Sequence, residues 1–153
     1  MTNIIDLDAL AYADTAIYTV KHPKTGAVLG SFPVAGPGHP QLLEWEEAER
    51  RRSIAELQAY QMEAREAIDA GQTVPPTPEE KRTVADIRKA NAERLAAHVL
   101  PSDFSVKIDG KTVEFTRETA AEILANPRIP FLYEGMFRFV KSTENFMPNS
   151  AGA

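Results

Sequence analysis

The sequence contains no cysteine among its 153 residues. A disulfide framework, a thiolate metal site and a cysteine nucleophile are therefore excluded, and the absence is typical of a protein in a reducing cytoplasm. No stretch approaches the roughly 20 consecutive apolar residues that a membrane-spanning helix needs. Residues 1–13 contain neither lysine nor arginine, whereas a signal peptide begins with a basic stretch. We therefore expect a cytoplasmic protein that makes no contact with a membrane.

Recognisable catalytic and metal-binding motifs are also absent from the sequence. His22, His39 and His98 lie far apart, and no pair has the i,i+4 spacing of metal ligands on a helix. We expect each histidine to be solvated or to cap backbone groups. No serine lies in a G-x-S-x-G elbow, and Gly-Pro-Gly at 36–38 lacks the Lys-Ser/Thr ending of a phosphate loop. The carboxylates in residues 44–49 lack the spacing of a calcium loop and are typical of a solvated helix face.

These absences predict a protein without a catalytic residue, a metal ion or a cofactor, and so not an enzyme. Positive charge is scarce as well, because the formal net charge is -5 and the isoelectric point is near 5.2. An acidic chain is a poor partner for a phosphate backbone. The basic run Arg50-Arg51-Arg52 is short and follows acidic neighbours without interleaved aromatic residues. We expect no nucleic-acid partner.

What the sequence does contain predicts an α+β fold in a single domain spanning residues 1–153. Strand formers at 16–21 and 27–32 flank a turn-forming stretch, and Asp109-Gly110 between alternating residues favours a type I′ hairpin turn. Whether the two hairpins join in one small antiparallel sheet is left open. The predicted elements are an N-terminal hairpin at 14–34, a long helical pair at 41–70 and 78–99, a second hairpin at 103–115, and a short subdomain of C-terminal helices at 117–141.

The two long helices have recognisable ends. Gly71 stands where the C′ residue of the first helix would lie. Thr77, Pro78 and Glu80 form a capping box for the second. The pair forms either an antiparallel hairpin or two helices that point in different directions. The first helix has a thin apolar stripe interrupted by Gln61, so we expect it to stand out from the core or to need a partner. The stripe contains Ile54, Leu57, Ala64 and Ile68. In the second helix we expect Val84, Ile87, Leu95 and Val99 to face inward.

The C-terminal helix, roughly Pro130 to Lys141, is apolar over most of its circumference. It packs as core on the second hairpin, presents a hydrophobic docking face to another chain, or does both. The small polar residues after Pro148 predict a disordered tail. The residues that we predict to bind protein are Phe131, Tyr133, Met136, Phe137, Phe139 and Phe146 near the C-terminus, and Ile54, Leu57 and Ile68 in the first long helix.

Two stretches of the sequence are similar to a known family. The first is YTVKHPKTG at 18–26 with AGPGHP at 35–40, and a charged helix follows it. The second begins with VEFTRETA at 113–120 and LANP at 124–127. It continues with an aromatic helix ending Phe139-Val140 and with Asn145-Phe146. In these stretches, roughly half of its length, the chain resembles the tail assembly chaperones of long-tailed bacteriophages and prophages. It departs from the family before the second hairpin, where residues 98–102 replace a stretch that usually contains tryptophan.

The resemblance implies a non-enzymatic late protein of the host cytoplasm. Such chaperones coat the long helical tape measure protein and keep it soluble. They also help recruit major tail protein, and leave before the virion is complete. Some are also made in a longer form by ribosomal frameshifting, and whether this chain forms a homo-oligomer stays open. The alternative is a virion structural protein, such as a tail-completion, connector or minor tail protein. A small enzyme with an unfamiliar site is a third hypothesis, of a different class.

Overall fold

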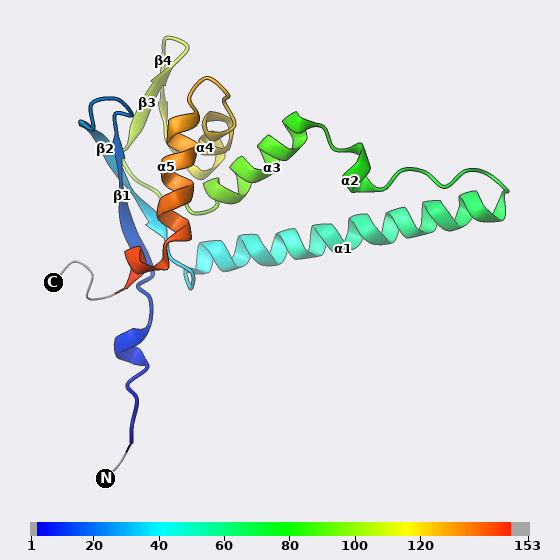
Figure 1. The fold of residues 1–153 in the computed structure, drawn as a ribbon, viewed down its shortest axis with the longest axis horizontal. Helices are drawn as coiled ribbons and strands as arrows, with labels where there is room; N and C mark the ends of the chain where they lie inside the picture. The colour runs from blue at the N-terminus through cyan, green and yellow to red at the C-terminus, as the bar shows by residue number, and fades with distance from the viewer. Residues whose placement is uncertain (1–2, 148–153) are drawn as a thin grey trace.

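The computed structural model describes residues 3–147 and confirms an α+β fold. Strands and helices build a body from which one long helix and an N-terminal segment project in different directions (Figure 1). The predicted tail after Pro148 lies outside the described residues. The elements are η1 Asp8–Leu10, β1 Thr15–Lys21, β2 Val28–Ala35, α1 Pro40–Asp69, α2 Pro78–Lys81, α3 Val84–Ala96, β3 Ser105–Ile108, β4 Lys111–Glu114, α4 Arg117–Leu124, α5 Pro130–Lys141 and η2 Thr143–Phe146, where η marks a 3₁₀ helix.

Both predicted hairpins form, and they make two separate two-stranded sheets rather than one. The His22 Nδ1 atom accepts the backbone N–H groups of Lys24 and Thr25 at 3.1 and 3.2 Å and so fixes the first turn. In the second turn Asp109 and Gly110 have φ angles of 52° and 76°. Positive φ at both central residues defines the type I′ turn, so the turn chemistry of the second hairpin is confirmed.

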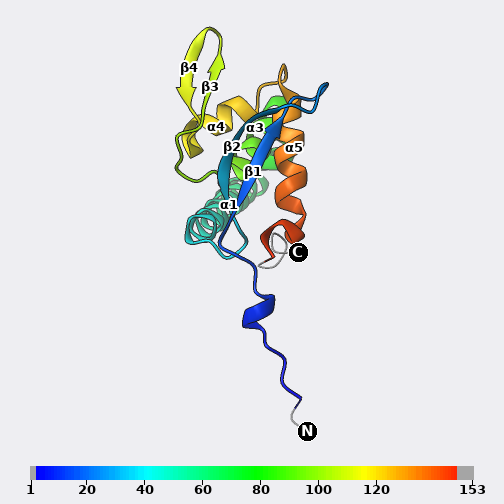
Figure 2. The same cartoon turned by 90° about the vertical axis from the view of Figure 1, so that its left-hand side faces the viewer.

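Aromatic side chains join the two hairpins to the C-terminal helices. The Phe32 ring lies 5.2 Å from Phe104 and 4.8 Å from Phe115, between centroids. On its other side Tyr18 contacts Phe32 at 5.5 Å and Phe139 on α5 at 5.3 Å. Figure 2 shows β1 and β2 in front of α3 and α5. The core therefore lies between the first hairpin, the second hairpin and helices α3, α4 and α5.

Helix α1 starts at the body and then leaves it. Its 30 residues span about 45 Å at 1.5 Å per residue, and Leu42 is its one buried residue among those described. The His39 side chain caps its first turn by accepting the Gln41 N–H at 3.1 Å. The Gln41 amide then donates to the carbonyl oxygens of Ala97 and Val99, at 3.0 and 2.8 Å. These bonds attach the inner end of α1 to the chain that follows α3.

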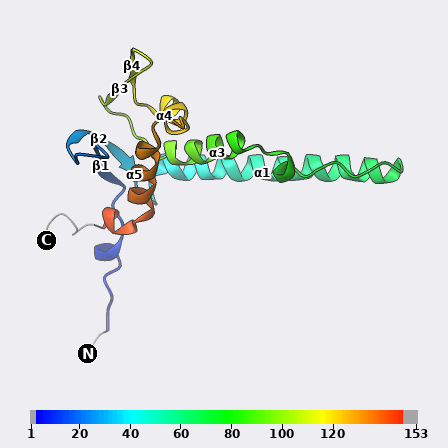
Figure 3. The ribbon, with the colours of Figure 1, turned by 45° about the horizontal axis from the view of Figure 1, so that its top comes forward.

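The outer end of α1 closes in a Schellman motif. Gly71 has a φ of 70°, its N–H donates to the Ile68 carbonyl, and the Gln72 N–H donates to the Ala67 carbonyl at 2.8 Å. The prediction that Gly71 ends this helix is therefore confirmed. The chain then returns antiparallel to α1 through α2 and α3 (Figures 1 and 3). The Tyr60 hydroxyl donates to the Pro75 carbonyl at 3.2 Å and holds the returning segment against α1.

The prediction of one continuous helix over 78–99 is wrong. Thr77 and Glu80 do form the predicted capping box, but α2 ends at Lys81 because Arg82 is extended, with φ -69° and ψ 130°. Thr83 and Asp86 make a second capping box that starts α3. The hydrogen bonds from Thr83 hold the pKa of the Asp86 carboxyl below its ordinary value. Two caps in succession therefore divide the segment.

This division also changes which apolar residues of α3 face the core. Leu95 and Val99 are buried, as predicted. Val84 and Ile87, expected to face inward, are 73% and 49% exposed. Val84 is the first residue of α3, and the body covers the other end of this helix, where Ala92, Leu95 and Ala96 are buried. The correction leaves two large apolar side chains on the surface near the start of α3.

Candidate protein-docking surfaces

The titratable side chains of the described residues do not gather into a reactive site. No polar or charged residue in 3–147 is buried, and no three of its His, Asp and Glu residues could hold a metal ion together. The histidines bond to backbone groups instead, and His98 Nδ1 lies 3.0 Å from the Ala35 carbonyl oxygen. Of the helices in the same described range, none combines the length and the apolar character that crossing a membrane requires.

The C-terminal residues that we predicted to bind protein divide into a buried, a half-buried and an exposed group. Met136 and Phe146 are 0% and 2% exposed, so both lie in the core rather than on a surface that a partner could contact. Helix α5 lies against β1 here, because Gly135 has no side chain and the Tyr18 ring fits onto it. Three further aromatic residues are half-buried against the core, and Phe137 is 44% exposed. The half-buried residues are Phe131, Tyr133 and Phe139.

Where α5 lies against β1, Tyr18 is the buried aromatic residue with a titratable side chain. Burial raises the pKa of its hydroxyl, and the nearby positive charge of Arg138 offsets part of that rise. Among the described residues the hydroxyl makes no hydrogen bond. It therefore stays neutral at physiological pH, as an aromatic packing residue. Its role is to fill the space above Gly135.

Three of the four residues of the predicted stripe on α1 are exposed, and Ala64 is half-buried. Ile54, Leu57 and Ile68 are 43%, 53% and 63% exposed. Their spacings of three and eleven residues are close to one and three helical turns, so they share one side of the helix. No described element covers that side. The structure thus places these three predicted binding residues on one accessible surface.

A cleft lies beside this stripe, between α1 and the returning segment, and we call it the α1–α3 cleft. It has a volume of about 500 Å³, with Leu57 common to the cleft and the stripe. Trp45 and Tyr60 give its walls aromatic character, and three arginines and three glutamates line it. Arg52 and Glu49 pair within it at 2.7 Å. The charged residues of the lining are Arg52, Arg82, Arg94, Glu49, Glu56 and Glu79.

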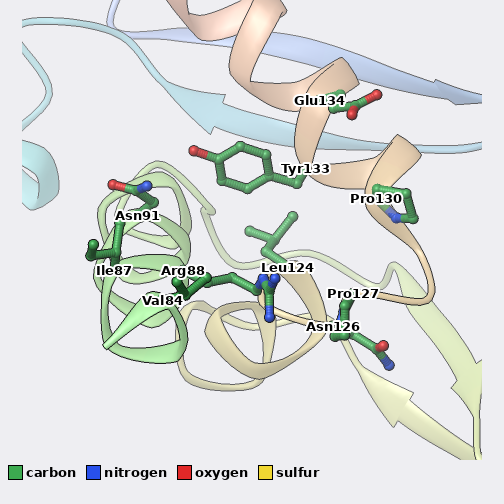
Figure 4. A pocket seen from close by; sticks show the side chains of 10 residues that line it. All are labelled: Val84, Ile87, Arg88, Asn91, Leu124, Asn126, Pro127, Pro130, Tyr133 and Glu134. Atoms are coloured by element: carbon green, nitrogen blue, oxygen red, sulfur yellow. The ribbon is translucent and has the colours of Figure 1, made fainter. Parts of the chain in front are cut away.

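A second surface, the α3–α5 groove, runs between α3 and α5 on the body. It consists of two adjoining hollows of about 290 and 250 Å³ that share Asn91 and Tyr133. Figure 4 shows Tyr133 extending from α5 toward Asn91 on α3, with Leu124 of α4 nearby. The other apolar residues of the groove are Val84, Ile87, Pro127, Pro130, Leu95, Phe137 and Val140.

The rim of the α3–α5 groove carries more positive than negative charge. Arg88 lines one hollow with Glu134, whereas Arg94 and Lys141 line the other without a carboxylate. The Lys141 ammonium lies 5.7 Å from the centroid of the Phe137 ring, within the range of a cation–π contact. The groove is therefore an apolar channel with a basic margin.

Reasoning from the sequence missed most of the residues of these two surfaces. Trp45 and Tyr60 were not singled out, although they lie four turns apart, within the predicted first helix. Val84 and Ile87 were assigned to the core. The Thr83-x-x-Asp86 spacing of a capping box was the sequence feature that could have placed Val84 at an exposed helix start. Comparison with known proteins adds no relative, since no family model, curated protein or solved structure matches the chain.

Proposed function

We propose that the protein is a tail assembly chaperone of a long-tailed bacteriophage. It binds helical segments of the tape measure protein, keeps that protein soluble in the host cytoplasm and helps recruit major tail protein, without catalysis. The observation that carries the proposal is α1, a helix of 30 residues with one buried residue and an exposed apolar stripe. The resemblance of the sequence to this family is the ground for proposing this partner, and α1 with its cleft supplies the surface.

The stripe offers enough apolar area to matter for binding. Leu57 and Ile68 are each more than half exposed, and full burial of such a side chain contributes about 1.5–3 kcal/mol. Covering the exposed part of both contributes about 2–3 kcal/mol, which corresponds to roughly a 30- to 150-fold change in affinity. A partner helix with apolar residues at i, i+3 and i+7 presents a matching stripe.

The α1–α3 cleft supports the same kind of partner. Its aromatic walls suit apolar side chains, and its charged residues of both signs suit the polar flanks of an amphipathic helix. The ion pairs on α1, such as Arg52 with Glu49, lie on the surface and contribute little to stability. They are therefore free to exchange partners when a helix binds.

Co-expression with the tape measure protein of the same genome tests the proposal. The chain should raise the soluble fraction of that protein and co-purify with it. The double variant Leu57→Glu/Ile68→Glu places two carboxylates on the stripe and should lower the affinity by at least about 30-fold. Its matched control is Ala55→Glu/Met62→Glu, which adds the same charge at exposed positions about 120° or more round the helix.

Two results would count against the proposal. If the wild-type chain leaves the tape measure protein as insoluble as before, the chain is not its chaperone. If stripe and control variants weaken the complex equally, α1 binds through another side. Mass spectrometry of purified particles separates the chaperone from the alternative of a virion structural protein, because a chaperone should be absent from finished virions.

A further inference from the structure

The N-terminal segment ahead of β1 is apolar, and no other described part of the chain covers it. We call residues 3–12 the arm. Five of its side chains are between 44% and 79% exposed, and none belongs to either core cluster. A short segment this apolar gains stability when another surface covers it. The exposed side chains are Ile4, Ile5, Leu7, Leu10 and Tyr12.

The arm is fixed at its base and directed away from the body. The Ala13 N–H donates to the Phe146 carbonyl, and the Gly36 N–H donates to the Asp14 carbonyl, both at 2.6 Å. Beyond this base the arm extends away from α3 and α5 (Figures 1 and 2). Docking into the groove of the same chain would require the arm to reverse at its fixed base. Docking into a neighbouring copy requires no such reversal.

Part of the arm also forms a hydrogen-bonded turn. The Asp6 Oδ1 atom accepts the N–H groups of Asp8 and Ala9, at 3.1 and 3.2 Å, and the Leu10 N–H donates to the Leu7 carbonyl. This turn shortens a segment that would span about 30 Å when fully extended. Helix α3, with 13 residues, is about 20 Å long. The arm is therefore long enough to lie along α3, which borders the groove.

The charge of the arm is opposite to that of the rim of the α3–α5 groove. The arm carries Asp6 and Asp8 and no lysine or arginine. The α3–α5 groove has an apolar floor and a rim with Arg88, Arg94 and Lys141 against Glu134. Complementary potentials of this kind fix orientation and suppress wrong partners. Within the described residues, the acidic apolar arm and the basic apolar groove match each other in polarity and in charge.

We propose that the arm of one copy docks in the α3–α5 groove of a second copy, so that the chain associates with itself through exchanged arms. A reciprocal exchange closes a dimer, whereas a non-reciprocal one extends to larger assemblies. The inference does not depend on the tape measure protein. It uses a surface separate from the α1 stripe, so the two proposals can fail independently.

Analytical ultracentrifugation of the purified full chain tests the proposal across a concentration series. We expect an assembly of at least twice the 16.9 kDa chain mass. Removal of residues 1–11 should give a monomer with an unchanged melting temperature, because the arm contributes nothing to the core. Charge reversal by Asp6→Lys/Asp8→Lys should weaken association at least about tenfold, since it turns attraction to the rim into repulsion.

A compensating variant makes the test specific. Arg88→Glu/Lys141→Glu in the groove should also weaken association, and mixing it with the Asp6→Lys/Asp8→Lys chain should restore assembly between the two. The matched control is Lys107→Glu/Lys111→Glu, which makes the same charge change at exposed positions of the second hairpin and should leave association intact. None of these three double variants changes a residue that lines the α1–α3 cleft.

Three outcomes would overturn the proposal. A full chain that stays monomeric at every concentration would show that the arm is free or docks in its own groove. Association that survives removal of the arm would place the interface elsewhere. Equal weakening by the groove variant and the hairpin control would mean that net charge, rather than the groove, governs association.

Discussion

From the contact between Tyr18 and Gly135 we predict that the effect of Gly135→Ala on stability changes sign when residue 18 is changed. A Cβ atom at Gly135 would collide with the Tyr18 hydroxyl oxygen, but it would lie 3.5 Å from the ring carbon that carries that hydroxyl. The second distance is an ordinary van der Waals contact. Gly135→Ala should therefore destabilise the protein when Tyr18 is present and stabilise it when phenylalanine replaces Tyr18.

The magnitudes follow from two opposing effects. Alanine is better than glycine inside a helix by about 1 kcal/mol. Overpacking costs about 1–3 kcal/mol, and here the Tyr18 ring cannot move aside, because it is held between Phe32 and Phe139. Gly135→Ala alone should therefore lower the free energy of unfolding by up to about 2 kcal/mol. In the Tyr18→Phe background it should raise that free energy by up to about 1 kcal/mol.

Urea unfolding of the four proteins in this cycle measures the coupling. Trp45, the single tryptophan, and far-ultraviolet circular dichroism provide two probes. Tyr18→Phe alone should change stability by about 0.5 kcal/mol or less, since the hydroxyl has no hydrogen bond to another described residue to lose. We expect a coupling free energy of at least about 1 kcal/mol. If Gly135→Ala has the same effect in both backgrounds, the packing argument is wrong.

Two further predictions concern stability. Because burial raises the folded-state pKa of Tyr18 above 10.0, the contribution of its neutral form is fully present below pH 10 and is lost as the pH rises through the folded-state value. The urea midpoint of unfolding, measured between about pH 8 and 11, should therefore fall less steeply with pH in the Tyr18→Phe variant than in the wild-type protein. Gln41→Glu replaces the amide donor to the carbonyls of Ala97 and Val99 with a carboxylate, and should cost about 2–3 kcal/mol in urea unfolding. Gln61→Glu, exposed on the same helix, should cost little.

The parts of the fold that depend on neighbouring residues could be predicted from the sequence. Asp109-Gly110 has few alternatives to a type I′ turn, and its φ angles agree with that turn. Gly71 marked the end of α1 and Thr77 the start of α2, because a left-handed residue and a capping box are local events. The thin stripe on α1 likewise predicted a helix that stands out from the core or needs a partner, and the structure shows that it stands out (Figure 1).

The parts that depend on packing between distant segments could not be predicted. Helix α5 is apolar on most of its surface, so periodicity does not tell which side the body covers. Helix α5 packs on Tyr18 through Gly135 and Phe139, and Phe139 packs on Phe146 of η2. In this arrangement Met136 and Phe146 are buried while Phe137 stays exposed. The exposure of Val84 likewise depends on where α3 starts. That position follows from competition between two capping boxes and a continuous helix.

The apolar surfaces left exposed suggest an order of assembly. The arm and the α3–α5 groove complement each other within one sequence, so a second copy of the chain is sufficient to cover both. The stripe on α1 has no counterpart among the described residues, and self-association through the arm leaves it open. A chain that has assembled with itself would therefore still present α1, in several copies, to a helical partner.

Several weak α1 contacts on one long helix reinforce each other, since each binding event raises the effective concentration of the next. On this reasoning, removal of the arm should weaken the proposed binding to the tape measure protein without any change in α1, whereas Leu57→Glu/Ile68→Glu should lower that affinity by at least about 30-fold and leave self-association intact.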